Sequence, residues 1–342
     1  MLKFRAQCLA AVRSFFSTRE YLEADTPALA PALIPESCLE VFRTDYLIPF
    51  RKGENAVKPL FLVPSPEVYL KRLIADHGVD VFQISKCYRN VESVGKIHSP
   101  EFTMLEYYTM QADYHDSLSL TESLIAYLSD TVCRESVFMD SKMVESLQPP
   151  FITLSMNAAF IRYAGFALAE CDTSTKLAFH AAKLDLGTES DLALWSWDDL
   201  YELILVHTIE PNLPRNKPVF LIDYPARVPC LAAEHDENFA TGAGEIITWK
   251  VKERWELYVH GVELANCYTE ERTTERIKQY VESEMMAKKV SARIPHPPIE
   301  NFGEICARMP PCSGVAMGLD RLIMILAGRS TLDSVLPFFL QP

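Results

Sequence analysis

Apolar residues near the start of the chain recur at every third or fourth position between Leu2 and Phe16, which places them on one face of a helix. The same segment carries basic residues and no acidic one, a feature that organellar presequences share. No apolar run follows it, and the longest uncharged stretch, residues 146–161, contains two prolines and several polar residues. We therefore expect an amphipathic helix to about Thr18, packed on the core of a cytoplasmic protein that has no membrane segment.

Two segments further along alternate apolar and polar positions, as half-buried strands do. Val81–Arg89 and Phe102–Tyr108 are also rich in β-forming residues, so we expect them to pair antiparallel across the loop Asn90–Pro100. Other strands or extended segments are expected at Tyr21–Ala24, Leu39–Ile48, Pro59–Val63, Val219–Asp223, Arg254–His260, Val262–Thr269 and Gly314–Met317.

The remaining segments have helical patterns. Helices are expected over Glu67–Ala75, 271–288, 299–307 and Leu319–Leu326, with mainly helical structure over 113–205. Pro66 stands where the first of these helices would start, and Trp195 and Trp197 are expected in buried or interface positions. Because the strands do not alternate regularly with helices, we predict an α+β fold, an antiparallel sheet flanked by helices, in a single domain over residues 1–342.

Composition narrows the range of functions. Lys and Arg total 33 against 46 Asp and Glu, and the net charge of -13 disfavours a general nucleic-acid binder, because phosphate neutralisation requires a basic surplus. The nine cysteines occur without a CxxC pair, which indicates reduced thiols rather than a disulfide framework or a zinc site. Neither the GxGxxG motif nor a P-loop motif occurs, so a nucleotide must be held by another arrangement.

The first candidate residues lie on the paired segments. Alternation places Arg89 at the end of a polar strand face, and Glu106 and Tyr108 share one face of the partner strand. A guanidinium fixed there can bind a phosphate through planar, bidentate donors, but an ordinary cross-strand salt bridge uses the same residues. His98, in the connecting loop, is by itself typical of a solvated loop residue.

Three carboxylates, Glu256, Glu263 and Glu270, follow at intervals of seven residues along two adjacent strands. Clustered carboxylates repel one another unless a cation neutralises them, and oxygen ligands suit the Mg²⁺ that accompanies a triphosphate. Strict alternation puts Glu263 on the face opposite to Asn266 and Glu270, so a turn or β-bulge is required to bring them together. An exposed acidic strand face is the alternative.

The third candidate segment is Gly314–Leu322, a strand that runs into a helix. Gly318 would let a flat ring approach the backbone closely, and Arg321 would project from the first helical turn. Ordinary cap chemistry, with glycines at a strand end and Asp320 near a helix N-terminus, explains the same residues equally well.

In this order the segments resemble the signature motifs of class II aminoacyl-tRNA synthetases, most closely the lysyl branch. Leu22–Pro27 is similar to motif 1, which lies at the dimer interface in that family, Tyr88–Tyr108 to motif 2 and Gly314–Leu322 to motif 3. Pro64–Glu67 is similar to the loop on the substrate side, and Glu263–Asn266 to the strand that binds metal and amino acid. The resemblance covers essentially the whole chain.

Within that class, the sequence resembles the family of elongation factor P lysine ligases, which are paralogues of the lysyl enzymes. Because the segment that resembles the synthetase core starts at residue 1, we expect no anticodon-binding OB-fold domain, and Ala316 stands where lysyl-tRNA synthetases usually have a glycine. The resemblance implies that ATP and Mg²⁺ activate (R)-β-lysine, and that a homodimer transfers it to a lysine of translation elongation factor P without tRNA. A synthetase-like ligase for lysine or another amino acid with a different acceptor, such as a tRNA or a small amine, and a silent paralogue are the alternatives.

The resemblance also implies a role for each matching residue. Arg89 would hold the α-phosphate and Arg321 the γ-phosphate, and Glu256 and Glu263 would bind the metal. The nucleotide would contact Arg89, Glu92, His98, Phe102, Glu263, Leu264, Gly318 and Arg321. The amino acid would contact Ser65, Pro66, Glu67, Glu106, Tyr108, Asn266, Glu270 and Ala316.

The sequence departs from the family pattern at several positions. Motif 2 reads Arg89-Asn90-Val91-Glu92 where the family usually has Arg-x-Glu, and Ser99 stands where Asn is usual. Cys267-Tyr268 replaces the common Gly-Phe, and the segment Ala232–Lys250 is longer than its counterpart. Such changes would alter the amino acid or the protein partner without abolishing adenylation.

Overall fold

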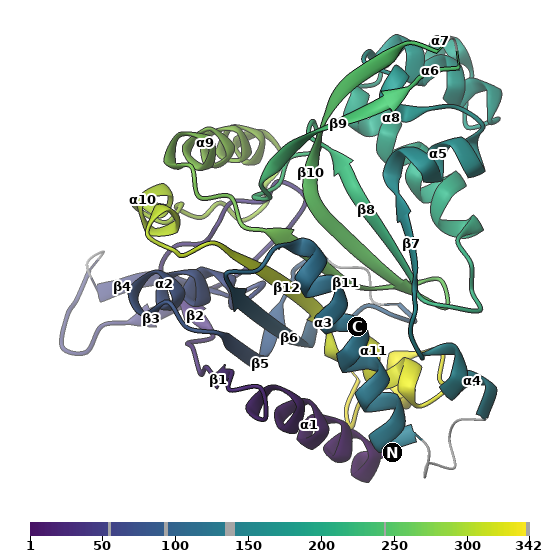
Figure 1. The fold of residues 1–342 in the computed structure, drawn as a ribbon. Helices are drawn as coiled ribbons and strands as arrows, with labels where there is room; N and C mark the ends of the chain where they lie inside the picture. The colour runs from purple at the N-terminus through teal and green to yellow at the C-terminus, as the bar shows by residue number, and fades with distance from the viewer. Residues whose placement is uncertain (54–55, 92–94, 134–140, 243, 340–342) are drawn as a thin grey trace.

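Figure 1 shows the computed structural model, which describes residues 1–53, 56–91, 95–133, 141–242 and 244–339. The α-helices are α1 (Leu2–Ser17), α2 (Glu67–His77), α3 (Tyr114–Leu128), α4 (Ser141–Ser146), α5 (Met156–Ala164), α6 (Ser174–Lys183), α7 (Glu189–Leu192), α8 (Trp197–Ile204), α9 (Thr274–Ser291), α10 (Phe302–Ala307) and α11 (Leu319–Leu326). The strands are β1 (Leu22–Glu23), β2 (Leu29–Ala30), β3 (Phe42–Leu47), β4 (Val57–Leu62), β5 (Val81–Tyr88), β6 (Glu101–Met110), β7 (Ile152–Ser155), β8 (Val219–Pro225), β9 (Glu234–Ala240), β10 (Ile246–Val259), β11 (Val262–Thr269) and β12 (Cys312–Gly318).

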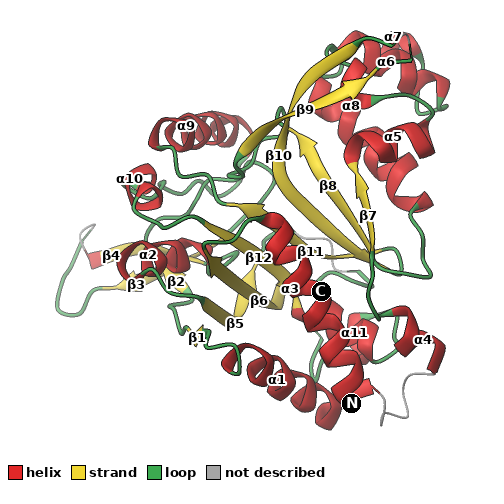
Figure 2. Cartoon of the chain, viewed as in Figure 1, coloured by secondary structure: helices red, strands yellow, loops and turns green. Residues whose placement is uncertain are grey.

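The large sheet has the strand order β1-β5-β6-β12-β11-β10-β8-β7, with β9 paired to β10. Its pairs are antiparallel except β1 with β5 and β7 with β8, which are parallel. The α+β fold with a mainly antiparallel sheet flanked by helices is therefore confirmed, as is the antiparallel pairing of β5 with β6. A second, small sheet has the order β2-β4-β3 and lies beside α2 (Figure 2).

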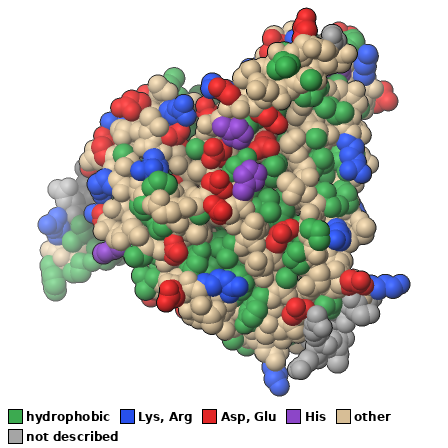
Figure 3. All heavy atoms as spheres, in the orientation of Figure 1, with side chains coloured by type: hydrophobic (Ala, Val, Ile, Leu, Met, Phe, Trp, Pro, Cys, Tyr) green, Lys and Arg blue, Asp and Glu red, His purple; other side chains and the backbone are tan. Residues whose placement is uncertain are grey.

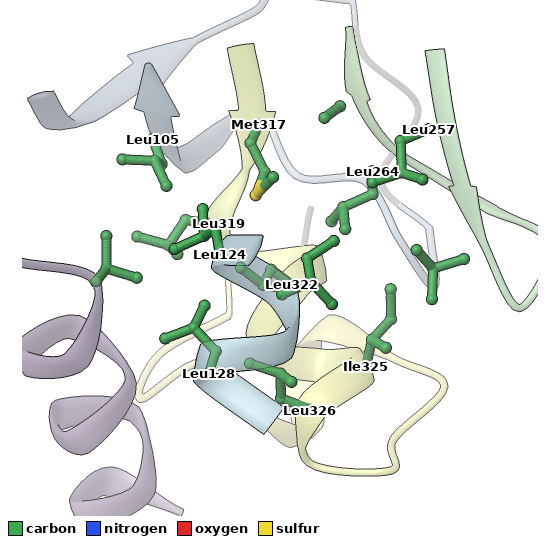
Figure 4. Close-up of a cluster of buried hydrophobic side chains, with 14 of the residues drawn as sticks. Leu105, Leu124, Leu128, Leu257, Leu264, Met317, Leu319, Leu322, Ile325 and Leu326 are labelled. Atoms are coloured by element: carbon green, nitrogen blue, oxygen red, sulfur yellow. The ribbon is translucent and has the colours of Figure 1, made fainter. Parts of the chain in front are cut away.

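The main hydrophobic core fills the space between one face of the large sheet and helices α1, α3 and α11. Figure 4 shows Leu105 and Met317 from adjacent strands pointing toward Leu124 of α3 and Leu322 of α11. Side chains alternate between the two faces of a strand, so residues next to these, such as Glu106, point to the opposite face. The core thus fixes which polar residues are presented together on the other side of the sheet.

A separate hydrophobic cluster holds α5, α6 and α8 against the far end of the sheet at β8. The segment 113–205 is mainly helical, as predicted, but it also contains the short strand β7. Trp197 is buried there and donates a hydrogen bond from its ring nitrogen to the Cys171 carbonyl, 2.7 Å away. Trp195, which precedes α8, is 44 % exposed and therefore not buried, and for this residue the expectation of an interface position stays a prediction.

Strands β9 and β10 form a ribbon that reaches from the sheet toward α6 and α8 (Figure 1). The strand expected over Arg254–His260 therefore extends much further toward its N-terminus, and β9 was not predicted at all. Among the residues that the structure describes, no helix combines the length and apolar character needed to cross a membrane.

Candidate active site

Polar side chains line up in two rows across four neighbouring strands, on the face opposite to the main core. The register places Glu106, Ala316, Asn266 and Glu256 in one row. The adjacent row consists of Tyr108, Gly314, Tyr268 and Arg254. Residues that are far apart in the sequence therefore form a single surface, whose neighbours include α2, α9 and the end of β5.

At the β6 end of these rows lies a buried cluster of charged groups. Lys71 of α2 is 1 % exposed, and its Nζ lies 2.5 Å from a carboxylate oxygen of Glu67 and 2.8 Å from one of Glu270. Glu106 accepts hydrogen bonds from the Ser65 hydroxyl at 2.6 Å and the Tyr108 hydroxyl at 2.8 Å. The cluster thus contains three carboxylates and one ammonium group.

Burial shifts the pKa values of these groups. Burial and the nearby Glu67 raise the pKa of Glu106 to about 8, against the lowering effect of its two hydroxyl donors. Burial raises the pKa of Glu270 to about 7, although Lys71 lowers it. Burial alone would lower the pKa of Lys71, but Glu270 and Glu67 raise it well above its usual value. A further cation among these carboxyl groups would lower their pKa values and favour their ionised form.

Gly314 is required by the packing of this cluster. A Cβ atom at this position would lie 2.4 Å from the Tyr108 ring and 2.6 Å from a carboxylate oxygen of Glu270. The absence of a side chain lets both groups lie against the strand. By contrast, a Cβ at Gly318 would meet only the aliphatic part of Arg321, at 3.5 Å or more.

The β-bulge required by the carboxylate spacing is present. The pairing of β10 with β11 shifts between Leu257 and Tyr258, so that Leu257 faces Ala265 and Tyr258 faces Glu263. The extra residue, Leu264, points into the hydrophobic core (Figure 4), and Glu263 lies on the same face of the sheet as Asn266. Because the Leu264 side chain is buried in the core, only its backbone remains for the nucleotide contact that the sequence predicts.

The carboxylates of Glu263 and Glu256 lie near arginine side chains. Glu263 is 48 % exposed, its carboxylate is 3.8 Å from Arg321, and burial by surrounding protein together with the negative charge of Glu256 raises its pKa to about 7. Glu256 pairs with Arg254 and accepts a hydrogen bond from the Tyr258 hydroxyl at 2.8 Å. The predicted alternative of an isolated acidic strand face does not describe this arrangement.

Arg89 and Arg321 belong to the same site, since both lower the pKa of Glu263. The Arg89 guanidinium lies 5.2 Å from the centre of the Phe102 ring, and its Nε is buried without a hydrogen-bond partner. In the part of the chain that the structure describes, Arg89 forms no ion pair with Glu106, so the cross-strand salt bridge is absent. Arg321 donates to the carbonyl oxygens of Ile97, at 3.1 Å, and Glu263, at 2.8 Å, and joins the motif 2 loop to β11.

The candidate metal ligands fit one mode of Mg²⁺ binding. Within the described ranges, no group of three or more His, Cys, Asp or Glu residues is arranged to hold a metal ion. Mg²⁺ bound with a nucleotide ordinarily takes one or two carboxylates, and phosphates and water complete its octahedron. Glu256 and Glu263 suit that mode and do not form a cage of their own.

The structure brings most of the predicted residues to this face of the sheet, and it adds others. Glu92 lies outside the described residues. His98 is half-buried and directly follows Ile97, whose carbonyl oxygen accepts a hydrogen bond from Arg321. The residues that the sequence reasoning missed are Lys71, whose spacing from Glu67 is that of a helical ion pair, and Arg254. Arg254 lies 4.3 Å from the centre of the Tyr224 ring and donates from Nε to Asn266 at 3.3 Å.

One face of the antiparallel sheet thus carries an arginine from the end of a strand pair, a second arginine from a strand-to-helix turn, and carboxylates on the strands between them. The family described as tRNA synthetases class II (D, K and N) matches residues 1–341, and the chain belongs to this family. Membership implies an ATP-dependent aminoacyl ligase.

Proposed function

We propose that this protein activates a diamino acid, (R)-β-lysine, as its adenylate with ATP, and transfers it to the ε-amine of a lysine on translation elongation factor P. The observation that carries the choice of amino acid is the buried cluster around Lys71. Its three carboxylates exceed its one ammonium group by two negative charges when all are ionised. A diamino acid supplies two ammonium groups, and a desolvated ammonium group requires a paired carboxylate.

Arg89 and Arg321 would neutralise the negatively charged groups of the reaction, the carboxylate and the phosphates. The unpaired Nε of Arg89 is a donor for the substrate carboxylate or the α-phosphate, and Phe102 beside it offers a flat surface to adenine. Arg321 would neutralise the terminal phosphates. Mg²⁺ held by Glu256 and Glu263 would supply further neutralisation of the triphosphate. In-line attack of the amino-acid carboxylate on the α-phosphate is then favoured by positioning and charge.

A protein acceptor fits the chain better than a tRNA. The net charge is -13, and basic side chains on the face shown in Figure 3 are dispersed among acidic ones instead of forming one patch. The register sets Ala316 between Glu106 and Asn266, where lysyl-tRNA synthetases usually have Gly. The extra methyl group on the floor of the pocket supports an amino acid other than L-lysine, as in the ligases that this sequence resembles.

The test is ATP/pyrophosphate exchange with the purified protein and (R)-β-lysine, L-lysine or no amino acid. We expect exchange to be strongest with (R)-β-lysine and mass spectrometry to show one added β-lysyl group on elongation factor P. Preference for L-lysine would refute the choice of amino acid, and exchange without modification of the factor would refute the acceptor. Charging of tRNA in a parallel reaction would identify tRNA, and not elongation factor P, as the acceptor.

A homodimer in the cytoplasm is part of the same proposal. The motif 1 residue Leu22 is 53 % exposed on β1, the strand at one edge of the large sheet. An exposed edge strand with an apolar side chain is suited to association with a second copy. Sedimentation equilibrium that gave the mass of one chain at micromolar concentration would contradict the dimer.

A further inference from the structure

One carboxylate beside the reaction centre has no role in the functions proposed above. Glu36 is partly exposed, in the segment between the small sheet's β2 and β3. Among the described residues, its carboxylate forms no hydrogen bond or ion pair, whereas its backbone oxygen accepts from the Lys288 ammonium group and from the Leu39 amide. A carboxylate without a partner is available to a ligand.

The backbone around Glu36 is held in place from two sides. On one side, the Lys288 ammonium group donates to the carbonyl oxygens of Glu36 at 2.7 Å and Leu39 at 2.5 Å, and Glu284 accepts from the Ser37 amide at 2.5 Å. Both side chains of α9 are more than nine-tenths buried. These hydrogen bonds hold the backbone from Glu36 to Leu39 against α9.

On the other side, the segment is tied to the motif 2 residue next to Arg89. The Asn90 amide donates to the Glu40 carbonyl at 2.8 Å, and the Asn90 side chain donates to the Val41 carbonyl at 3.3 Å. The charged and titratable groups that face Glu36 from the surrounding elements are Glu67, Arg89, Tyr268, Tyr280, Glu284 and Lys288. The segment that carries Glu36 is therefore joined to α9 on one side and, on the other, to the motif 2 residue that follows the arginine assigned to the α-phosphate.

Resting on the proposed function, we propose that Glu36 takes the proton that the acceptor amine must lose before it attacks the adenylate. A lysine side chain arrives as an ammonium ion and loses two protons on becoming an amide. Glu36 accepts the first; the amine nitrogen then forms a bond to the carbonyl carbon, the bond from that carbon to the phosphate oxygen breaks, and AMP leaves with the electron pair. Solvent receives the second proton.

The environment of Glu36 suits this step. Burial, and then the negative charge of Glu67, raises the pKa of Glu36 to about 7, although Arg89 and Lys288 lower it. A general base is most effective when its pKa lies near the working pH. Glu67 itself is engaged with Lys71, and Glu106 is engaged with Ser65 and Tyr108, so neither is equally free to accept a proton.

The experiment compares Glu36→Gln with the wild type in three reactions. ATP/pyrophosphate exchange reports adenylate formation. Capture of the adenylate by hydroxylamine, which is already unprotonated at neutral pH, reports attack without a base. Transfer to the ε-amine of Nα-acetyl-lysine amide and to elongation factor P reports attack by a protonated amine. We expect the first two reactions to be unchanged and the transfers to fall by about 10²- to 10⁴-fold.

The pH profile and two further variants complete the test. Wild-type transfer should rise with pH and level off above about 7, whereas Glu36→Gln should lose this bend, and Glu36→Asp should restore part of the rate. Asp45→Asn, a surface carboxylate of the neighbouring strand β3 paired with Arg43, is the matched control and should leave every reaction unchanged.

Two results would overturn the proposal. Equal losses in exchange, hydroxylamine capture and transfer would show that Glu36 holds the amino acid or the loop, and undiminished transfer would show that it has no part in the step. If the wild-type protein catalyses ATP/pyrophosphate exchange with neither (R)-β-lysine nor L-lysine, the proposed function is refuted, and this proposal with it. Exchange without modification of elongation factor P would refute only that acceptor, because the small-amine reaction still decides the role of Glu36.

Discussion

Binding of the diamino acid should become tighter as the pH rises from about 6 to about 8. In the free protein, burial raises the pKa values of Glu106 and Glu270 to about 8 and about 7, so both carboxyl groups hold protons at the acidic end of this range. A protonated carboxyl group cannot neutralise an ammonium ion. The ligand therefore has to displace protons at low pH, and its own side-chain amine stays charged throughout.

The magnitude follows from the fraction of each group that is ionised. For a pKa of about 7, this fraction rises from about one eleventh near pH 6 to about ten elevenths near pH 8, so the affinity should increase about tenfold if only Glu270 must ionise. The corresponding increase for Glu106, with a pKa of about 8, is about 50-fold. A tenfold change corresponds to about 1.4 kcal/mol of binding free energy.

Protein stability without ligand should show the opposite dependence on pH. Carboxyl groups whose pKa is higher in the folded than in the unfolded chain bind more protons in the folded state, so their ionisation between about pH 4.5 and 8 lowers the free energy of unfolding. A diamino acid that pairs with the ionised groups should restore this loss. The rise in melting temperature that the ligand produces should therefore grow with pH.

The assay is isothermal titration of the protein with (R)-β-lysine and L-lysine at several pH values, accompanied by thermal melts. Norleucine, which lacks the second amine, serves as the ligand control and should show a much weaker dependence. Glu270→Gln removes one of the ionising groups, so its affinity should be lower at pH 8 and its pH dependence shallower. Affinity that stays constant or falls between pH 6 and pH 8 would refute the assignment of these carboxylates to ammonium binding.

Four substitutions extend these tests. Ala316→Gly should shift the ratio of exchange kcat/KM toward L-lysine by about tenfold or more, since a methylene-sized change in a pocket is worth about 1–3 kcal/mol, and an unchanged ratio would contradict the placement of its methyl group. Gly314→Ala should lower the free energy of unfolding by about 1–3 kcal/mol and raise KM for the amino acid, because its Cβ overlaps two side chains of the pocket. Asp320→Asn should cost about 3–5 kcal/mol in denaturant unfolding, because it breaks a buried ion pair to α1 at 2.6 Å. Arg321→Ala should lower the exchange rate by about 10²- to 10³-fold with little change in circular dichroism, and a wild-type rate would exclude its phosphate role.

Sequence patterns predicted the elements that have one apolar and one polar face. The helix from Leu2 and the strand pair of β5 and β6 have such faces because one side of each packs against the main core. Strand β9 has the sequence Glu234-His235-Asp236-Glu237 and lies in a ribbon with alternating exposed and half-buried positions, so no apolar face marks it. Its partner β10 supplies the pairing, which a local pattern does not contain.

The bulge in β11 was predictable because a chemical requirement conflicted with the geometry of a regular strand. Glu263 and Asn266 are three residues apart, so a regular strand would place them on opposite faces. Because both were expected at one site, an extra residue was needed between them. The inserted residue is apolar Leu264, which joins the core, and burial of its side chain compensates for the interrupted ladder. The burial of its side chain explains why an apolar residue, Leu264, stands between Glu263 and Asn266 in the sequence.

Lys71 shows what spacing alone does not contain. Its distance of four residues from Glu67 is typical of an exposed helical ion pair, which contributes little to stability. In the folded chain, Glu270 of the β11–α9 connection lies against the same ammonium group and excludes it from solvent. Three carboxylates around one buried cation leave a charge imbalance that neither a helix nor a strand reveals by itself. On the proposed function, the charge of the amino acid that this cluster accepts depends on the contact between Lys71 and Glu270, which are about 200 residues apart in the sequence.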